Sequence, residues 1–131
     1  MFGFGKKVTN SPTRAAREGL INDFQKAKKA ISNADVATKT SVAFGLNAVN
    51  TMFYRTYGGP QKFCSVSYEK KIEYCIALND FEEKMRSQDQ LASLGVAVFK
   101  MWIAALTEDD IELRKQIEPF LVELSKLAPG L

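Results

Sequence analysis

Two segments of the chain are almost free of charge, although 25% of all residues are charged. Residues 36–54 and 90–106 contain one charged side chain each, Lys39 and Lys100. A helix that is apolar nearly all the way round has to be covered by other helices, a partner or a membrane. The second segment is shorter than the ~20 residues that cross a bilayer, and the first contains several threonines and asparagines. We therefore predict two buried helices at the centre of a helical domain.

Capping residues and apolar spacing set the first two helices. Ser11 can cap a helix over residues 12–32, which has proline in its first turn and apolar residues at helical spacing. Asp35 can cap the next helix, over residues 36–57. The Gly-Gly-Pro sequence at 58–60 then ends it.

A third helix is predicted to start between Lys62 and Ser67 and to end at about Arg86. It holds both cysteines, Cys64 and Cys75, eleven residues apart. If the helix is continuous, their Cα atoms lie ~16 Å apart. A disulfide needs Cα atoms within ~7 Å, so we expect two reduced thiols.

The fourth helix should begin at Ser87 or Asp89 and end at Leu106, and a fifth should follow at once. Thr107 can cap the fifth helix, with the three carboxylates of 108–110 at its positive end. This capping explanation needs no metal ion, and adjacent carboxylates on a helix diverge. We expect no metal site there.

Pro119 lies within the predicted fifth helix, although proline usually ends a helix. Apolar residues between Leu113 and Leu127 stay on one arc when the helix is wound straight through the proline. We predict a continuous helix kinked at Pro119, because proline removes one backbone hydrogen bond and clashes with the preceding turn. A fresh short helix starting at Pro119 is the alternative.

Glycines inside the two low-charge helices indicate a close contact. Gly45 and Gly95 each cost about 1 kcal/mol relative to alanine in a helix, so a neighbouring backbone is expected close by. The predicted fold is all-α, a single-domain bundle of about five helices in which the second and fourth helices are central. Residues 11–131 form this domain, and residues 1–10 form a flexible N-terminal tail.

Missing residues exclude much chemistry. The chain has no histidine, so the commonest general base and metal ligand are absent. Two cysteines cannot make a four-ligand zinc site, and no phosphate-binding glycine motif occurs. We expect a protein that is not an enzyme and holds no cofactor. The N-terminus lacks the apolar stretch of a secretory signal, so a cytoplasmic location is expected.

Charge is concentrated near the N-terminus. Residues 1–31 contain seven basic and two acidic residues, a net +5, which leaves −2 on the rest of the chain. This asymmetry is consistent either with a solubilising surface or with binding of phosphates on nucleic acid or an anionic membrane. The candidate phosphate-binding residues are Lys6, Lys7, Arg14, Arg17 and Lys28.

One connection gathers aromatic and basic side chains around a turn: Tyr54, Arg55, Tyr57, Lys62 and Phe63. Tyrosine and arginine are enriched at binding hot spots. Either these residues bind a partner, or Tyr54 and Phe63 close the end of the core. The leading hypothesis is a protein–protein interaction module whose partner is another protein or a second copy of the chain, as a homodimer. The alternatives are the phosphate binder and a carrier of an apolar small molecule in the bundle core.

Overall fold

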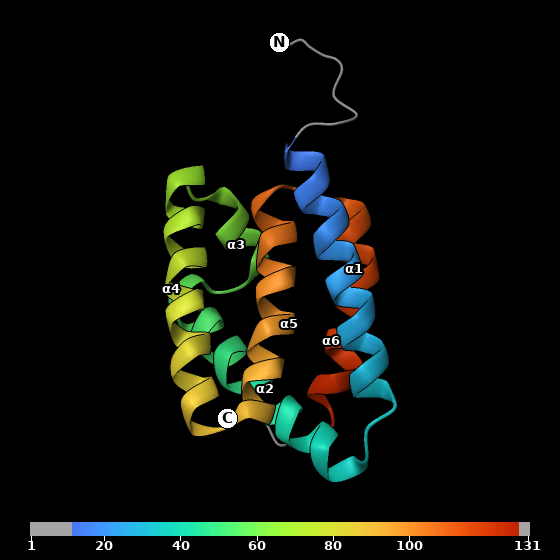
Figure 1. Cartoon of the computed structure of the whole chain (residues 1–131). Coiled ribbons are helices and arrows are strands. Elements are labelled where there is room, and N and C mark those ends of the chain that lie inside the picture. Colours follow the sequence, from blue (N-terminus) through green and yellow to red (C-terminus); the bar gives the residue numbers. More distant parts are fainter. Residues whose placement is uncertain (1–11, 129–131) are drawn as a thin grey trace.

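The computed structural model describes residues 12–128, and these residues form helices and no strand (Figure 1). This confirms the all-α prediction; the predicted tail over residues 1–10 lies outside the described residues. The described part contains six helices rather than five: α1 (Pro12–Ser32), α2 (Val36–Tyr57), α3 (Pro60–Ser65), α4 (Tyr68–Gln88), α5 (Gln90–Thr107) and α6 (Ile111–Ser125).

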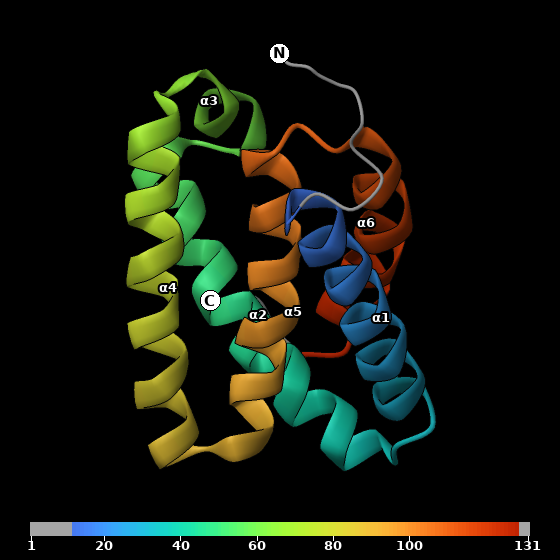
Figure 2. The same cartoon turned by 45° about the horizontal axis from the view of Figure 1, so that its top comes forward.

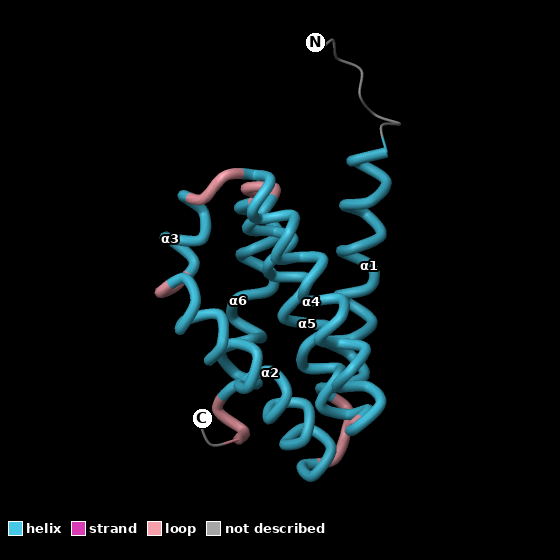
Figure 3. Tube along the Cα trace, turned by 90° about the vertical axis from the view of Figure 1, so that its left-hand side faces the viewer, coloured by secondary structure: helices cyan, strands magenta, loops and turns pink. Residues whose placement is uncertain are grey.

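Helix α5 is the centre of the fold and packs against all five other helices. It stands between α4 on one side and α1 and α6 on the other (Figure 2), and the connections between helices are short (Figure 3). Within the described residues, α5 alone is long and apolar enough to span a membrane, and 61% of it is buried inside the fold. Its apolar surface is thus largely covered by the other helices.

The crossing of α2 and α5 confirms the predicted close approach at both glycines. A Cβ atom added to Gly45 would lie 1.9 Å from the carbonyl oxygen of Ala92, and one added to Gly95 would lie 2.1 Å from that of Val42. Both distances are far inside van der Waals contact. The two backbones therefore meet directly, and no larger residue fits at either position without moving a helix.

An aromatic cluster fills the space beyond this crossing. Phe53 of α2 is fully buried, and its ring lies 5.5–5.8 Å from six other aromatic rings. Among these partners, Phe63 comes from α3, Tyr74 from α4 and Trp102 from α5. Four of the six contacts are edge-to-face, a geometry that adds about 0.5–1.5 kcal/mol per pair beyond the burial of area. This cluster joins four helices into one core.

The third predicted helix corresponds to α4, whose cap Ser67 lies within the predicted range for its start, but the short helix α3 before it was not predicted. The chain leaves helical geometry at Val66, and α4 starts again with Ser67 as its cap, whose Oγ accepts a hydrogen bond from Lys70 N at 3.2 Å. The continuous-helix argument about the cysteines therefore does not apply. Cys64 and Cys75 are both free and half-buried in the structure.

The predicted cap of the last helix is also wrong. Thr107 is buried at the end of α5, where its hydroxyl donates to the carbonyl of Ile103. Asp109 then adopts a left-handed φ of 54°, and Asp110 caps α6 by accepting from Leu113 N at 3.1 Å. Residues 107–110 are all polar, so the sequence offers more than one candidate cap. Because Asp109 has left-handed backbone geometry, helix α6 begins only after Asp110, which is therefore the cap.

Helix α6 continues through Pro119, as predicted, so the alternative of a fresh helix is wrong. The size of any bend at Pro119 stays a prediction. At the C-terminal end of α6, the carbonyl oxygens of Ser125 and Ala128 both accept hydrogen bonds from the side-chain amide of Asn47, a buried residue of α2. Both distances are 3.1 Å. These bonds attach the C-terminal end of α6 to α2.

Candidate functional site

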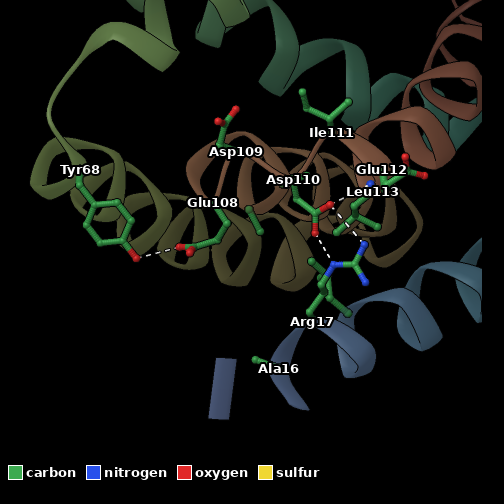
Figure 4. A pocket seen from close by; sticks show the side chains of 12 residues that line it. Ala16, Arg17, Tyr68, Glu108, Asp109, Asp110, Ile111, Glu112 and Leu113 are labelled. Atoms are coloured by element: carbon green, nitrogen blue, oxygen red, sulfur yellow. Dashed lines mark hydrogen bonds and ion pairs between the residues drawn. The ribbon is translucent and has the colours of Figure 1, made fainter. Parts of the chain in front are cut away.

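A pocket of about 750 Å³ lies at the end of the bundle where α1 begins, α5 ends and α6 begins (Figure 4). It combines residues that are up to 97 positions apart in the sequence. The lining residues are Ala16, Arg17 and Leu20 of α1, Tyr68 of α4, Ala104 and Ala105 of α5, and Glu108 to Leu113 of the α5–α6 connection and α6.

The floor of this pocket is apolar because the helices present small side chains there. Ala104 and Ala105 lie near the end of the apolar stretch of α5, and Ala16 faces the same space from α1. Leu20 and Leu113 close the sides, and Leu113 is almost fully buried. Alanines on neighbouring helices leave a hollow where larger side chains would have interdigitated.

The rim of the pocket is acidic. Glu108, Asp109, Asp110 and Glu112 contribute four carboxylates against the single guanidinium of Arg17. All four belong to the α5–α6 connection or the first turn of α6, where the positive end of the helix dipole favours negative charge. The rim therefore keeps a surplus of negative charge beside an apolar floor.

Arg17 and Asp110 form the one ion pair across the pocket in the described part of the chain. Arg17 Nε donates to Asp110 Oδ2 at 2.5 Å, and Nη2 donates to Oδ1 at 3.3 Å, a two-point contact between α1 and the cap of α6 (Figure 4). The hydrogen bond from Arg17, together with that from Leu113 N, lowers the pKa of Asp110 below its usual value. Asp110 therefore has a structural role, because it caps α6 and joins it to α1.

The other rim carboxylates are differently placed. Tyr68 donates its hydroxyl to Glu108 Oε2 at 2.7 Å, and this hydrogen bond raises the pKa of Tyr68. Among the residues that the structure describes, Glu108, Asp109 and Glu112 form no ion pair. These three carboxylates are exposed or at the pocket mouth, so a cation from outside can reach them.

The aromatic and basic residues predicted to bind a partner are divided between the surface and the core. Tyr54 and Arg55 are exposed and line a shallow hollow on α2, and Lys62 is exposed on α3. Phe63 is fully buried and Tyr57 is half-buried, with their rings 5.0 Å apart in the aromatic cluster. The structure therefore places Tyr54 and Arg55 together on one surface and puts Phe63 in the core.

The candidate phosphate-binding residues are not brought together by the described part of the chain. Lys6 and Lys7 lie outside the described residues, as does the side chain of Arg14. Arg17 is engaged by Asp110, and Lys28 is exposed on α1 about three turns further along. Within residues 12–128, no three Cys, Asp or Glu side chains are arranged so that they could hold a metal ion.

No family model, curated protein or solved structure matches this chain. The pocket itself was not predicted from the sequence. The only local signals are the paired alanines at 104 and 105 and the acidic run at 108–110, which capping explained equally well. Neither signal shows that α1 leaves the alanines partly uncovered.

Proposed function

We propose that the protein is a non-enzymatic protein-binding module whose pocket receives an apolar side chain and an adjacent cation from a peptide segment of a partner. The observation that carries this proposal is the 750 Å³ cavity, which joins an apolar floor to three carboxylates that form no ion pair in the described part of the chain. Binding pockets typically have this composition, apolar walls with a few polar groups that fix orientation.

The two parts of the pocket would contribute differently to binding. Burying one leucine or phenylalanine side chain on the floor provides about 1.5–3 kcal/mol. Carboxylates at an exposed rim mainly steer a basic partner and select it, and salt screens their effect. Affinity should therefore follow the apolar residue of the peptide, and specificity should follow the cation.

Peptide display against the full chain tests the proposal. Selected peptides should carry lysine or arginine next to a large apolar residue, and a fluorescent copy of one selected peptide then serves as the probe. Glu108→Gln with Glu112→Gln should weaken probe binding about tenfold, which corresponds to 1.4 kcal/mol. Glu69→Gln with Glu83→Gln removes the same charge from exposed positions on α4, outside the pocket, and should leave affinity within about twofold.

Selection of acidic or purely polar peptides would contradict the proposal. Equal weakening by the two pairs of substitutions would also contradict it, because only overall charge would then matter.

The hollow beside Tyr54 and Arg55 is a second candidate for the same class of function. It is supported by an exposed tyrosine next to an exposed arginine, with Asn50 and Thr51 completing the lining. If this surface binds the partner, Arg55→Ala abolishes binding without lowering stability. Tyr54→Ala should also weaken binding, but its ring packs on Phe53, so a loss of stability accompanies it. Tyr57→Ala does not separate the two roles, because Tyr57 packs on Phe63 and Tyr74.

A further inference from the structure

We infer that the pocket is one end of a longer groove along α5, and that this groove binds the partner segment as a basic amphipathic α-helix of about four turns. The inference rests on the proposed function, because it concerns the same peptide site. It adds the conformation, the length and the direction of the bound segment.

A second pocket of about 420 Å³ adjoins the first one. It lies between α1, α4 and α5 and shares two lining residues with the first pocket, Leu20 and Ala104. Helices α1 and α4 stand on either side of α5 (Figure 2) and have little contact with each other. The face of α5 between them, with Ala97, Lys100 and Met101, is therefore only half-buried. The two pockets form one groove over this face.

The groove has the length of a short helix. On α4 its lining extends from Tyr68 to Glu82, fourteen positions apart, which corresponds to about 21 Å at 1.5 Å per residue. On α5 it extends from Ala97 to Glu108, about 16 Å. A helix of about 14 residues covers this length and presents apolar side chains at every third or fourth position to the groove.

The lining favours a helix over an extended peptide. The backbone groups of α1, α4 and α5 are bonded within these helices, so the groove offers side chains and almost no free backbone partner. An extended segment would leave its own N–H and C=O groups unpaired against Leu20, Met101 and Ala104. A helix satisfies these groups internally and buries only side chains.

Charge along the groove favours a basic segment. Four carboxylates at the pocket end face one guanidinium. At the other end, Glu82 accepts from Lys100 Nζ at 2.5 Å and from Arg86 Nη2 at 2.6 Å, so this carboxylate already has two cations. Asp23 lines the same end and forms no ion pair with any residue that the structure describes.

The surplus of negative charge is thus greatest at the pocket end, where α5 ends. The N-terminus of a helix carries positive partial charge and is stabilised by neighbouring carboxylates. The bound segment should therefore place its N-terminus at Glu108 and Glu112 and lie antiparallel to α5.

NMR of a bound probe tests the conformation. Display of random peptides of about 16 residues against the full chain should select apolar residues at helical spacing, with lysine or arginine in the first turn. The carbon-13 shifts of one selected probe should be helical in the complex. A proline in the middle of this probe should weaken binding about a hundredfold, because it disrupts the helix. Extended shifts, or tolerance of the proline, would overturn the inference and leave the proposed function standing.

A substitution at the far end of the groove tests the length. Asn79→Trp adds an indole at an exposed position of α4 that lines only the second pocket, and it should weaken probe binding at least about tenfold. The control Asn22→Trp adds the same side chain at an exposed position of α1 that lines neither pocket, and affinity should stay within about twofold.

Comparison with the rim variant separates the two proposals. A probe weakened by Glu108→Gln with Glu112→Gln but not by Asn79→Trp occupies the pocket alone, which overturns the groove and leaves the proposed function standing. A probe weakened by neither change defeats the proposed function and the inference with it.

Spin labels on the probe test the direction. A nitroxide at the N-terminus of the probe should broaden the amide resonances of residues 108–112, and one at its C-terminus should broaden those of residues 79–82 and 97–100. The reverse pattern would overturn the assigned direction.

Discussion

Two regions of α5, about ten residues apart, contain small side chains and use them in opposite ways. At Gly95 the backbone of α2 comes so close that even a Cβ atom has no room. At Ala104 and Ala105 the neighbouring helices leave a 750 Å³ pocket open instead. The same kind of residue thus gives a tight contact or a binding cavity, depending on the helix that covers it.

The α2–α5 crossing and the pocket also differ in where their polar side chains lie. Side chains around the α2–α5 crossing are mostly apolar and buried, because an unpaired polar group there would lose its hydration. Around the pocket, carboxylates stay at the rim, where water or an incoming cation can satisfy them. The crossing therefore stabilises the fold, and the pocket is the part free to bind.

The largest effect is expected from a single methyl group at the crossing. Gly45→Ala puts a Cβ atom onto the Ala92 carbonyl, so α2 and α5 have to separate. Overpacking of this kind costs about 3 kcal/mol, and the better helix propensity of alanine returns about 1 kcal/mol. Urea unfolding should show a net loss of about 2 kcal/mol in the free energy of unfolding.

Gly19→Ala is the matched control, since Gly19 is an exposed residue of α1 with nothing within 4 Å of an added Cβ atom. It should raise stability by about 0.5–1 kcal/mol. If Gly45→Ala and Gly19→Ala changed the free energy of unfolding equally, the close backbone contact at Gly45 would be contradicted.

A loss of similar or smaller size is expected where α6 is attached to α2. Asn47→Ala removes both hydrogen bonds to the carbonyls of Ser125 and Ala128 and leaves these acceptors without their donor. Loss of such a buried partner costs about 1–3 kcal/mol. Thermal unfolding measures this loss, with Asn22→Ala as the control because Asn22 is an exposed asparagine of α1. Similar melting temperatures for the two variants would contradict this role of Asn47.

The ion pair at the pocket predicts a modest dependence of stability on pH. Because the pKa of Asp110 is lower in the folded chain, the unfolded chain binds more protons near that pKa. The stabilisation is complete above the unfolded value of about 3.9 and disappears as pH falls through the folded value. Asn is also a good helix cap, so Asp110→Asn removes mainly the charge.

As pH falls below about 4, the unaltered chain should therefore lose more stability than Asp110→Asn. Parallel curves for the two proteins would show that the Arg17–Asp110 pair contributes nothing measurable.

The smallest effect on stability is expected at the pocket itself. Ala16→Trp adds a large side chain at an exposed position that lines the cavity. Surface substitutions of this kind change stability by less than about 0.5 kcal/mol. The same variant should block binding of the probe peptide, because the indole fills the floor. A marked loss of stability would mean that the cavity is part of the tightly packed core.

Much of the fold was predictable because its signals are local. The boundaries of α1, α2 and α5 follow from a proline, a capping aspartate and a Gly-Gly-Pro stop, and the glycines at 45 and 95 indicated the close contact. The separate helix α3 was not predicted because residues 61–67 contain no glycine or proline that would mark the break at Val66.

The site was less predictable because it depends on tertiary contacts. Phe63 was a candidate binding residue because its neighbours in the sequence are basic and aromatic, but in the fold its side chain is fully buried in the core. The acidic run at 108–110 has the composition of a helix start and serves as one at Asp110. Only the distant pairing with Arg17 of α1 shows that it also borders a pocket.

Hydrogen–deuterium exchange with and without the probe peptide is the most direct test of the division between crossing and pocket. We predict slower exchange on binding at residues 16–20 and 104–113, with no change in the α2–α5 crossing around Gly45 and Gly95. Protection at residues 50–57, around Tyr54 and Arg55, would place the binding surface on α2 instead. That result would contradict the assignment of the pocket as the peptide site.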